Sequence, residues 1–365
     1  MKDQAAQREL FGDININFPS KIKHDARTST WQVIGKVHDS SRTLKTNFTF
    51  FRWEETIKSL WINNIYEAAF NTLLMIRLYF VNLLFLRFWA ADSRCWMISI
   101  LPLFLFVAAL LSGVSLIYTE IYLYKSLHPN ITAWLGSSAL CALLLVGVCK
   151  LWIFLGKNFG FFWLMQIYNF SALWMNGKLL QLDENLVSYT EAILKDAREN
   201  PDEDIVLLAH SVGTMLAVRV AFQLLDHPES PFNDKRKLRF VSLGHCIPLA
   251  SAQKSATRNY HHALGVLSKS RNIEWLDFSS PKDRASFPLI HPLHLKPQNP
   301  ASGLWPRMFS PRFHRIFSAQ KYQSMRWNWY AIHFLYFISP SSLEKEGYDF
   351  YKMLFCPPTE PLNLP

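Results

Sequence analysis

Apolar residues dominate two long stretches near the middle of the chain. The stretch from Trp96 to Tyr118 carries no charge, and it exceeds the roughly 20 residues that a helix needs to cross the hydrocarbon core of a bilayer. A second uncharged stretch begins at Ile131 and continues apolar past Lys150. The pattern therefore predicts a hairpin of transmembrane helices over about residues 96–118 and 131–155, joined by a polar loop over residues 119–130.

Two shorter apolar stretches flank this hairpin. The stretch from Ala68 to Trp89 is interrupted by Arg77 and Arg87, and the stretch 159–174 is rich in Phe, Trp and Tyr. Arginine and aromatic side chains suit helices that lie in the headgroup zone of a membrane, so we expect interfacial helices here. The pattern leaves two alternatives open, namely further membrane spans and helices that pack on a soluble domain.

Basic residues lie at both outer ends of the predicted hairpin, whereas the connecting loop has only Lys125 against Glu120. The basic residues are Arg77, Arg87 and Arg94 before it and Lys150, Lys157 and Lys178 after it. Because positive charge concentrates on the cytoplasmic side of membrane proteins, both ends are expected in the cytoplasm. We therefore expect an integral protein of the inner (cytoplasmic) membrane. A transporter is not favoured, because the two predicted spans contain no buried charge of the kind that marks an ion path.

Outside the membrane region, strand-like and helix-like patterns alternate. Residues 1–65 contain a strand-like run at 47–51 and a predicted helix from Trp53 to about Asn64. After the hairpin the pattern predicts a helix over 183–199, a strand over 204–208, a helix over 211–226, strands over 238–243 and 273–278, a loop-rich stretch over 281–311 and a helix over 330–338. Such alternation is typical of an α/β fold with a mostly parallel sheet and helices.

Composition agrees with a membrane protein. Half of the residues are hydrophobic, 15% are aromatic and only 18% are charged. The net charge is +10, and residues 254–326 contain twelve Lys or Arg against three acidic residues. Such an excess could meet nucleic acid or anionic lipid, because both present phosphates. No nucleic-acid-binding signature accompanies it, so membrane lipids are the expected partner and nucleic acid is not.

The five cysteines suggest neither a metal site nor a disulfide framework. They are Cys95, Cys141, Cys149, Cys246 and Cys356, with no CxxC pair or Cys/His metal spacing among them. We therefore expect no metal and no cofactor, and a reducing compartment.

One short motif carries candidate chemistry. Residues 205–213 read I-V-L-L-A-H-S-V-G and precede a helical pattern. A sharp strand-to-helix turn needs small residues two positions before and two after its nucleophile, and Ala209 and Gly213 occupy these positions around Ser211. The stretch, with His210 between Ala209 and Ser211, resembles the nucleophile elbow of the α/β hydrolase superfamily. Ala209 departs from the Gly that is commoner at this position, but some bacterial lipases of this fold also have Ala there. The alternative is a serine that caps the following helix.

This resemblance covers residues 183–355 and implies an α/β-hydrolase-like sheet interrupted by the transmembrane hairpin. It implies that Ser211 is the nucleophile and that the backbone N–H of Val212 is one oxyanion donor. The superfamily's order is serine, acid, histidine, which restricts the search to residues after Ser211. Asp277 and Asp283 are candidate acids; we choose Asp283 because it follows Ser-Ser-Pro in a loop, whereas Asp277 lies in the predicted strand.

Four histidines are candidates for the base: His291, His294, His314 and His333. In the superfamily the base lies on a loop after the last strand, before a terminal helix, and His333 best matches that place. His291 and His294 follow the acid too closely, in a proline-rich loop. The alternatives are that Asp283 is a solvated turn residue and that His333 is a core histidine.

Together these patterns predict four regions: an N-terminal cytoplasmic part over 1–65, a membrane region over 66–178, a hydrolase-like core over 179–355 and a Pro-rich tail over 356–365. The expected activity is hydrolysis of an ester or thioester, from a small-molecule or lipid acyl substrate, through Ser211, His333 and Asp283. Residues 1–65 lack the His-Gly pair that often marks a second oxyanion donor. The alternative is therefore an inactive hydrolase-like membrane scaffold or binding protein, and the oligomeric state stays open.

Overall fold

The chain folds into two compact units that are not consecutive in sequence. The computed structural model describes residues 14–17, 23–24, 27–37, 43–58, 60–62, 64–81, 83–91, 93–127, 130–253, 258–297, 305–326, 328–338, 348–350 and 353. Unit 1 combines residues 1–55 with residues 175–365, and unit 2 comprises residues 56–174. The expected Pro-rich tail lies outside the described residues.

A four-stranded parallel sheet forms the centre of unit 1. Its strands are β5 (Val206–His210), β6 (Leu238–Leu243), β7 (Ile273–Phe278) and β10 (Arg307–Phe309), in the order β10-β7-β6-β5. Each neighbouring pair runs parallel. The two central strands, β6 and β7, are buried and rich in branched apolar and aromatic residues, as parallel strands covered by other elements usually are, whereas β5 is largely half-buried and the edge strand β10 is half-buried or exposed. The predicted α/β class with a parallel sheet is confirmed.

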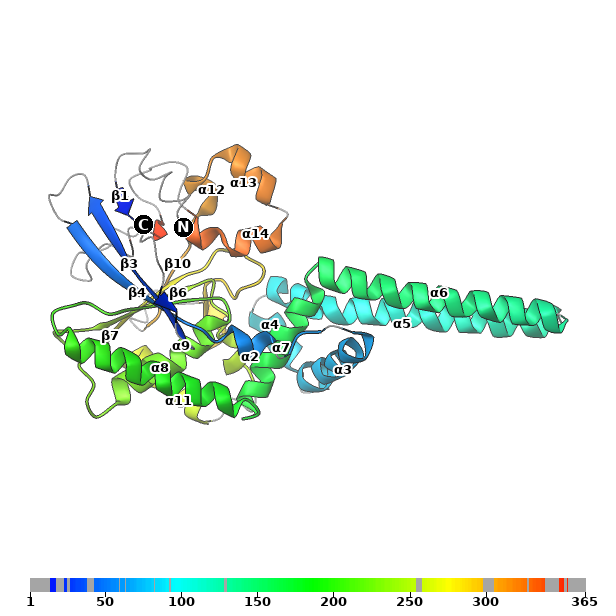
Figure 1. Ribbon diagram of the computed structural model, residues 1–365, viewed down its shortest axis with the longest axis horizontal. Helices are drawn as coiled ribbons and strands as arrows, with labels where there is room; N and C mark the ends of the chain where they lie inside the picture. The colour runs from blue at the N-terminus through cyan, green and yellow to red at the C-terminus, as the bar shows by residue number, and fades with distance from the viewer. Residues whose placement is uncertain are drawn as a thin grey trace. The chain divides into compact units, whose positions relative to one another are not determined.

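Helices cover this sheet. Helix α9 (Gly213–Asp226) packs on β5 and β6, and both α8 (Leu180–Glu199) and α11 (Arg258–Lys269) pack on α9 (Figure 1). Helix α8 is amphipathic, because its apolar residues recur every three or four positions and form one stripe. The buried residues of that stripe are Leu182, Leu186, Tyr189, Thr190, Leu194 and Ala197.

The first segment of unit 1 forms a separate antiparallel sheet. Its strands are β1 (Ile14–Asn17), β2 (Lys23–His24), β3 (Thr28–Val37) and β4 (Thr43–Phe51), with β3 pairing all three others. Val33 on β3 is fully buried in one apolar cluster with Val241 of β6. The Tyr189 hydroxyl donates a 2.8 Å hydrogen bond to the Arg52 carbonyl. These contacts join the two distant segments into one body.

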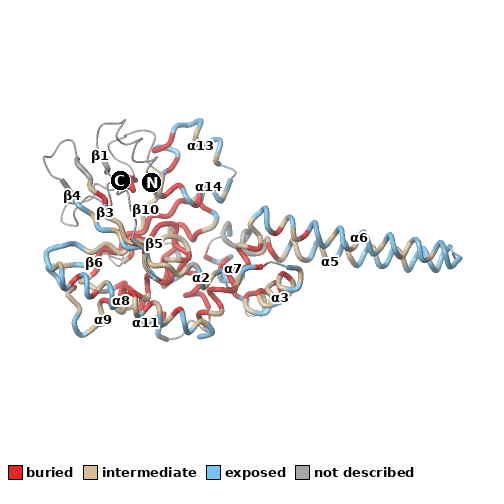
Figure 2. Tube along the Cα trace, viewed as in Figure 1, coloured by how far each residue is buried: buried red, intermediate tan, exposed pale blue. Residues whose placement is uncertain are grey.

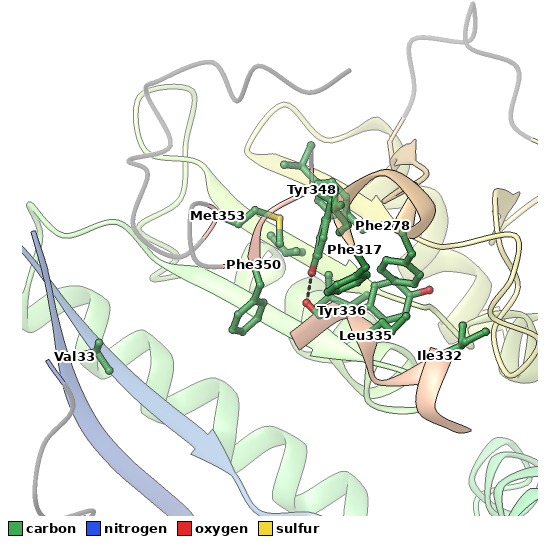
Figure 3. Close-up of a cluster of buried hydrophobic side chains, with 14 residues drawn as sticks. Val33, Phe278, Phe317, Ile332, Leu335, Tyr336, Tyr348, Phe350 and Met353 are labelled. Atoms are coloured by element: carbon green, nitrogen blue, oxygen red, sulfur yellow. Dashed lines mark hydrogen bonds between the residues drawn. The ribbon is translucent and has the colours of Figure 1, made fainter. Parts of the chain in front are cut away.

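Short elements complete unit 1. They are α2 (Glu54–Lys58), α10 (Pro248–Ser251), β8 (Ile290–His291), β9 (Lys296–Pro297), α12 (Phe313–Ile316), α13 (Ala319–Met325), α14 (Trp329–His333) and the 3₁₀ turn η3 (Leu335–Phe337). Aromatic residues from the last of these pack on the end of β7, where Tyr336, Tyr348 and Phe278 share one cluster. The Tyr348 hydroxyl donates to the Tyr336 carbonyl at 2.7 Å (Figure 3).

Unit 2 is helical. It contains α3 (Ile65–Met75), the π-helical turn η1 (Ile76–Val81), α4 (Leu84–Ala91), α5 (Ser93–Leu127), α6 (Ile131–Asn158) and α7 (Phe161–Met175). Two helices, α5 over Ile100–Leu127 and α6 over Ile131–Asn158, are long and apolar enough to cross a membrane. They pair with each other, and most of their described side chains are exposed or half-buried (Figure 2). The prediction of two long apolar helices that pair as a hairpin is confirmed.

Several predicted boundaries were wrong. The polar loop expected over 119–130 is mostly helix, because α5 continues to Leu127. Glu120, expected in the connecting loop, therefore lies inside a candidate span. Its carboxylate accepts hydrogen bonds from the hydroxyls of Ser137 at 2.8 Å and Ser138 at 2.9 Å on α6. These bonds offset part of the cost of placing a charge among apolar residues.

Three helices also differ from the expectation. The stretch 159–174, expected at the membrane surface, forms α7, which is buried on almost all sides and bonded to η1 through Tyr79. The helix expected from Trp53 to Asn64 is limited to α2. The helix expected over 330–338 divides at Phe334, which caps α14 before η3 begins.

Candidate active site

The site lies where three parallel strands end. His210 of β5 is in register with Leu243 of β6, which is in register with Phe278 of β7. The next residues continue the ladder, because the Ser211 N–H donates to the Leu243 carbonyl at 3.0 Å and the Gly244 N–H donates to the Phe278 carbonyl at 2.8 Å. The carboxyl ends of β5, β6 and β7 therefore meet at one edge, the usual place for ligand sites in open α/β sheets.

Ser211 occupies a strained turn between β5 and α9. Its φ is +54°, in the left-handed region that residues with a side chain rarely adopt. Such a conformation costs on the order of 1–3 kcal/mol and persists only where the surrounding structure enforces it. Here the ladder bond to Leu243 and the bond from the Thr214 hydroxyl to the Ser211 carbonyl, at 2.6 Å, hold the turn. The predicted strand, turn and helix around Ser211 are all present.

The small residues around the turn do not have equal roles. Ala209 is buried on β5 opposite Ser242. A Cβ at Gly213 would lie 3.7 Å from the nearest atom, in the Trp53 ring, which is ordinary contact. A side chain would therefore fit at position 213, and lack of space is not the reason for the glycine there. Val212 stands at the N-terminus of α9, where backbone N–H groups favour negative charge.

Asp283 and His333 form a buried pair. The Nδ1 atom of His333 lies 2.9 Å from both carboxylate oxygens of Asp283, and both residues are 0% exposed. With Nδ1–H donating to the carboxylate, the lone pair of the imidazole is on Nε2, as a general base requires. His333 is the last residue of α14, not a residue before a helical run as the superfamily's pattern suggested. The structure thus brings together the acid and the base that the sequence selected.

Further contacts hold the Asp283 carboxylate. The Tyr336 hydroxyl donates to Oδ2 at 2.9 Å and itself accepts from the Ser280 N–H at 2.9 Å. The Ala285 N–H donates to Oδ1 at 3.1 Å. Burial alone would raise the pKa of Asp283, but the neighbouring His333 and hydrogen bonds from His333, Ser286 and Tyr336 outweigh it, and the pKa is lowered from its ordinary value. The carboxylate therefore stays ionised.

Gly244 provides the space that this pair requires. Its φ is +51°, and an added Cβ would lie 2.8 Å from Asp283 Oδ2 and 2.9 Å from the Tyr336 ring. A side chain here would clash with the carboxylate and impose an unfavourable backbone conformation. Gly244 directly follows a buried strand, and that position was the only signal of its role in the sequence.

His210 connects the nucleophile turn to the base. Its Nε2 lies 2.8 Å from the backbone carbonyl of His333, and the two imidazole rings are 4.6 Å apart. Rings of Phe334, Tyr336 and Phe337 also surround it. Burial, and after it the neighbouring His333, lowers the pKa of His210 to about 3. His210 is therefore neutral near pH 7 and its Nε2–H donates to the carbonyl.

Cys246 links the turn to the acid loop. Its Sγ lies 3.7 Å from the Ser211 Oγ and 3.3 Å from the Ala285 carbonyl. Burial raises the pKa of the Cys246 thiol to about 12, so it remains protonated and is a poor nucleophile. Cys246 therefore fills space between the two loops.

Asp277, the rejected candidate acid, belongs to a second polar cluster. It accepts hydrogen bonds from the Ser242 hydroxyl at 2.7 Å and from the Ser279 hydroxyl at 2.6 Å, and it lies 4.0 Å from His245 Nε2. Burial raises the pKa of Asp277 and lowers that of His245, so both shifts favour neutral forms. Because Ser279 also accepts from the Leu289 N–H at 3.0 Å, this cluster anchors both ends of the loop that carries Asp283.

The other candidate bases lie elsewhere. His291 bonds to the Trp305 carbonyl and stacks on His294, while His314 lies beside Tyr322. Within the described part of the chain, none of these three contacts Asp283. In the same part, no group of three or more His, Cys, Asp or Glu side chains could hold a metal ion.

Sequence patterns did not reveal the roles of His210, Tyr336, Gly244 and Cys246, because each acts through contacts between distant segments. Comparison of the chain with protein-family models, with curated proteins and with solved structures finds no match. The resemblance to α/β hydrolases therefore rests on the residues and geometry described above.

Gly244→Ala should lower the free energy of unfolding by about 2–4 kcal/mol, from backbone strain and from the clash with Asp283. Chemical unfolding of the detergent-solubilised protein measures this. Gly265→Ala on α11 is the control: nothing lies within 4 Å of its added Cβ, so it should gain about 0.4–1 kcal/mol. Equal effects of the two substitutions would contradict the packing described at Gly244.

His210→Gln should flatten the dependence of stability on acidity. With a pKa near 3 when folded and about 6.5 when unfolded, His210 binds a proton only in the unfolded chain between these values. The free energy of unfolding therefore falls as pH drops through this window. Glutamine keeps a donor but cannot titrate, so the slope between pH 6.5 and 4 should decrease, by at most about 1.4 kcal/mol per pH unit.

Urea unfolding at a series of pH values provides the measurement for His210→Gln. The variant should match the wild type to within about 1 kcal/mol at pH 7.5, which separates titration from general destabilisation. Parallel curves for the two proteins would refute a neutral, buried His210.

Proposed function

We propose that this chain is a membrane-bound serine hydrolase that cleaves an ester or thioester through Ser211, His333 and Asp283. The observation that carries the proposal is the strained Ser211 turn at the end of β5, connected through His210 to the buried Asp283–His333 pair. A serine hydroxyl becomes nucleophilic when an imidazole takes its proton and a carboxylate holds that imidazole in the right orientation. The His333–Asp283 pair offers both groups. A mere helix cap would explain Ser211 but not this pair.

The proposed reaction has two steps. The Ser211 Oγ attacks the substrate carbonyl carbon while His333 Nε2 takes the hydroxyl proton, and Asp283 stabilises the resulting imidazolium. The Val212 N–H stabilises the oxyanion. The alcohol or thiol leaves with the proton from His333, which leaves an acyl group on Ser211. Water then attacks this acyl group, again with His333 as base, and the carboxylic acid departs.

Exposed aromatic side chains beside the base support an acyl substrate. Phe334 follows His333 directly, its ring lies 5.5 Å from the imidazole, and it is 37% exposed. Tyr330 is 54% exposed and its ring lies 4.9 Å from that of Phe334. Exposed apolar surface next to a reactive group can bind an acyl chain. With α5 and α6 crossing the inner membrane and unit 1 in the cytoplasm, membrane lipids are the proposed source of substrate.

Ser211 should react covalently with a fluorophosphonate probe in the detergent-solubilised protein. Ser211→Ala should abolish labelling, because the attacking oxygen is lost. Ser324→Ala, which changes an exposed serine on α13, should leave it intact. Mass spectrometry of the labelled peptide identifies the site. A folded protein that does not label, or equal labelling of Ser211→Ala, would exclude the enzyme and favour the alternative of an inactive membrane scaffold.

Phe334→Ala should weaken the preference for long acyl chains. We expect kcat/KM for p-nitrophenyl esters to rise from acetate to octanoate in the wild type. Losing the ring should reduce the octanoate-to-acetate ratio by roughly tenfold, which corresponds to about 1.4 kcal/mol of apolar contact. Phe50→Ala, at an exposed ring on β4, should not change the ratio. An unchanged ratio in Phe334→Ala would exclude this ring from the acyl site.

A further inference from the structure

The segment α3–η1–α4 at the start of unit 2 has one buried face and one exposed apolar face. Its buried face is anchored to α7, where the Tyr79 hydroxyl donates to the Tyr168 carbonyl at 2.6 Å and the Asn169 amide donates to the Asn71 carbonyl at 2.9 Å. The exposed face carries large apolar side chains that are each 48–83% exposed: Tyr66, Phe70, Leu73, Val81, Leu83, Leu86 and Trp89. Large exposed apolar side chains gathered on one short segment indicate a binding partner, whereas singly scattered ones do not.

The segment is bent, and it is directly continuous with a candidate membrane span. Helical residues 65–81 and α4 meet at 66°, and Leu83 at the bend has a φ of +55°. By helix geometry the two legs are roughly 26 Å and 12 Å long, so neither alone crosses the roughly 30 Å hydrocarbon core. Helix α5 begins at Ser93, just after α4.

Unit 1 is built from two chain segments, one before and one after unit 2, and this restricts how many times the chain can cross a membrane. Residues before and after unit 2 belong to the same compact body, with Val33 and Val241 in one cluster and Tyr189 bonded to Arg52. A folded body cannot have parts on both sides of a bilayer. Residues 56–174 must therefore cross an even number of times. If α5 and α6 both cross, as we propose, α3–η1–α4 cannot be a third crossing.

Helix α7 does not supply a fourth crossing that would restore an even number. It has 15 residues, about 22 Å of helix, which is too short to span. Its side chains are also buried almost all round, including Gln166 and Asn169, so it offers no apolar face to lipid. Helices α5 and α6 therefore remain as the crossings.

We propose that α3–η1–α4 lies in the leaflet on the side of unit 1 without crossing it, with its exposed apolar face in contact with lipid acyl chains. Arg77 and Arg87, one on each leg, are long cations suited to anionic headgroups at that depth. This placement rests on the proposed crossing of α5 and α6. It explains both the bend and the exposed face: a bent, one-sided segment fits a single leaflet.

Sidedness tests the crossing number. Single-cysteine variants of the full chain, made after replacing the native cysteines other than the buried Cys246 with serine, are labelled with a membrane-impermeant maleimide from either side of oriented vesicles. Lys58→Cys and Ser93→Cys, at exposed positions on either side of the segment, should label from the same side, and Asn130→Cys from the opposite side. Labelling of Lys58→Cys and Ser93→Cys from opposite sides would overturn the proposal. Labelling of Asn130→Cys from the side of Lys58→Cys would instead refute the crossing of α5 and α6.

Depth tests the lipid contact. Spin labels at Phe70 and Leu86, in vesicles of phosphatidylcholine and phosphatidylglycerol, should collide severalfold more with oxygen than with a water-soluble nickel complex, relative to a label at Phe50 in unit 1. Ratios equal to that at Phe50 would place the face in water, and protection from both reagents would indicate a second copy or another protein. Either outcome overturns the proposal. Fluorophosphonate labelling of the cysteine-replaced chain reports the hydrolase site separately.

Discussion

The charge on Asp283 constrains the whole site. A carboxylate with no exposed surface would lose several kcal/mol of hydration unless partners replaced the water. Those partners are the imidazole of His333, the hydroxyl of Tyr336 and the N–H of Ala285, and the first two come from α14 and η3. The short elements after β10 must therefore fold back over the ends of the parallel strands for the charge to be accommodated. Gly244 leaves the necessary room.

The same arrangement explains why the turn, the acid and the base depend on one another. The turn at Ser211 is held by β6, the acid loop is anchored by Ser279 and Ser280, and His210 bonds to the backbone of the base itself. Apart from the Leu289–Ser279 bond, which lies within one loop, these bonds join segments that are far apart in sequence. A change in one segment is thus transmitted to the others through buried hydrogen bonds, which tolerate little loss of geometry.

Local patterns predicted the elements whose stability is local. The bounds of β6 and β7 match the expectation, because continuous buried strands are visible as apolar runs. Chain order restricted the search for the acid and the base, and the choice of Asp283 and His333 among the candidates followed from their expected places in a loop and before a helical run. By contrast, Glu120 was placed in a loop, because a sequence window cannot reveal that Ser137 and Ser138 on another helix bond to it. For α7 the sequence left contact with a membrane and packing against protein both open, because an apolar helix has the same composition whether it meets lipid or protein.

The interruption of unit 1 by unit 2 has a consequence for how the protein is made. Strands β3 and β4 leave the ribosome first, but their partners in β6 and α8 follow only after about 120 residues of unit 2. At roughly 5–20 residues per second, this delay lasts on the order of 6–24 s. During that time the two long apolar helices α5 and α6 are synthesised, while β3 and β4 still lack the later segments that bury their apolar side chains. Folding of unit 1 therefore requires β3 and β4 to remain available for pairing until the whole of unit 2 has been made.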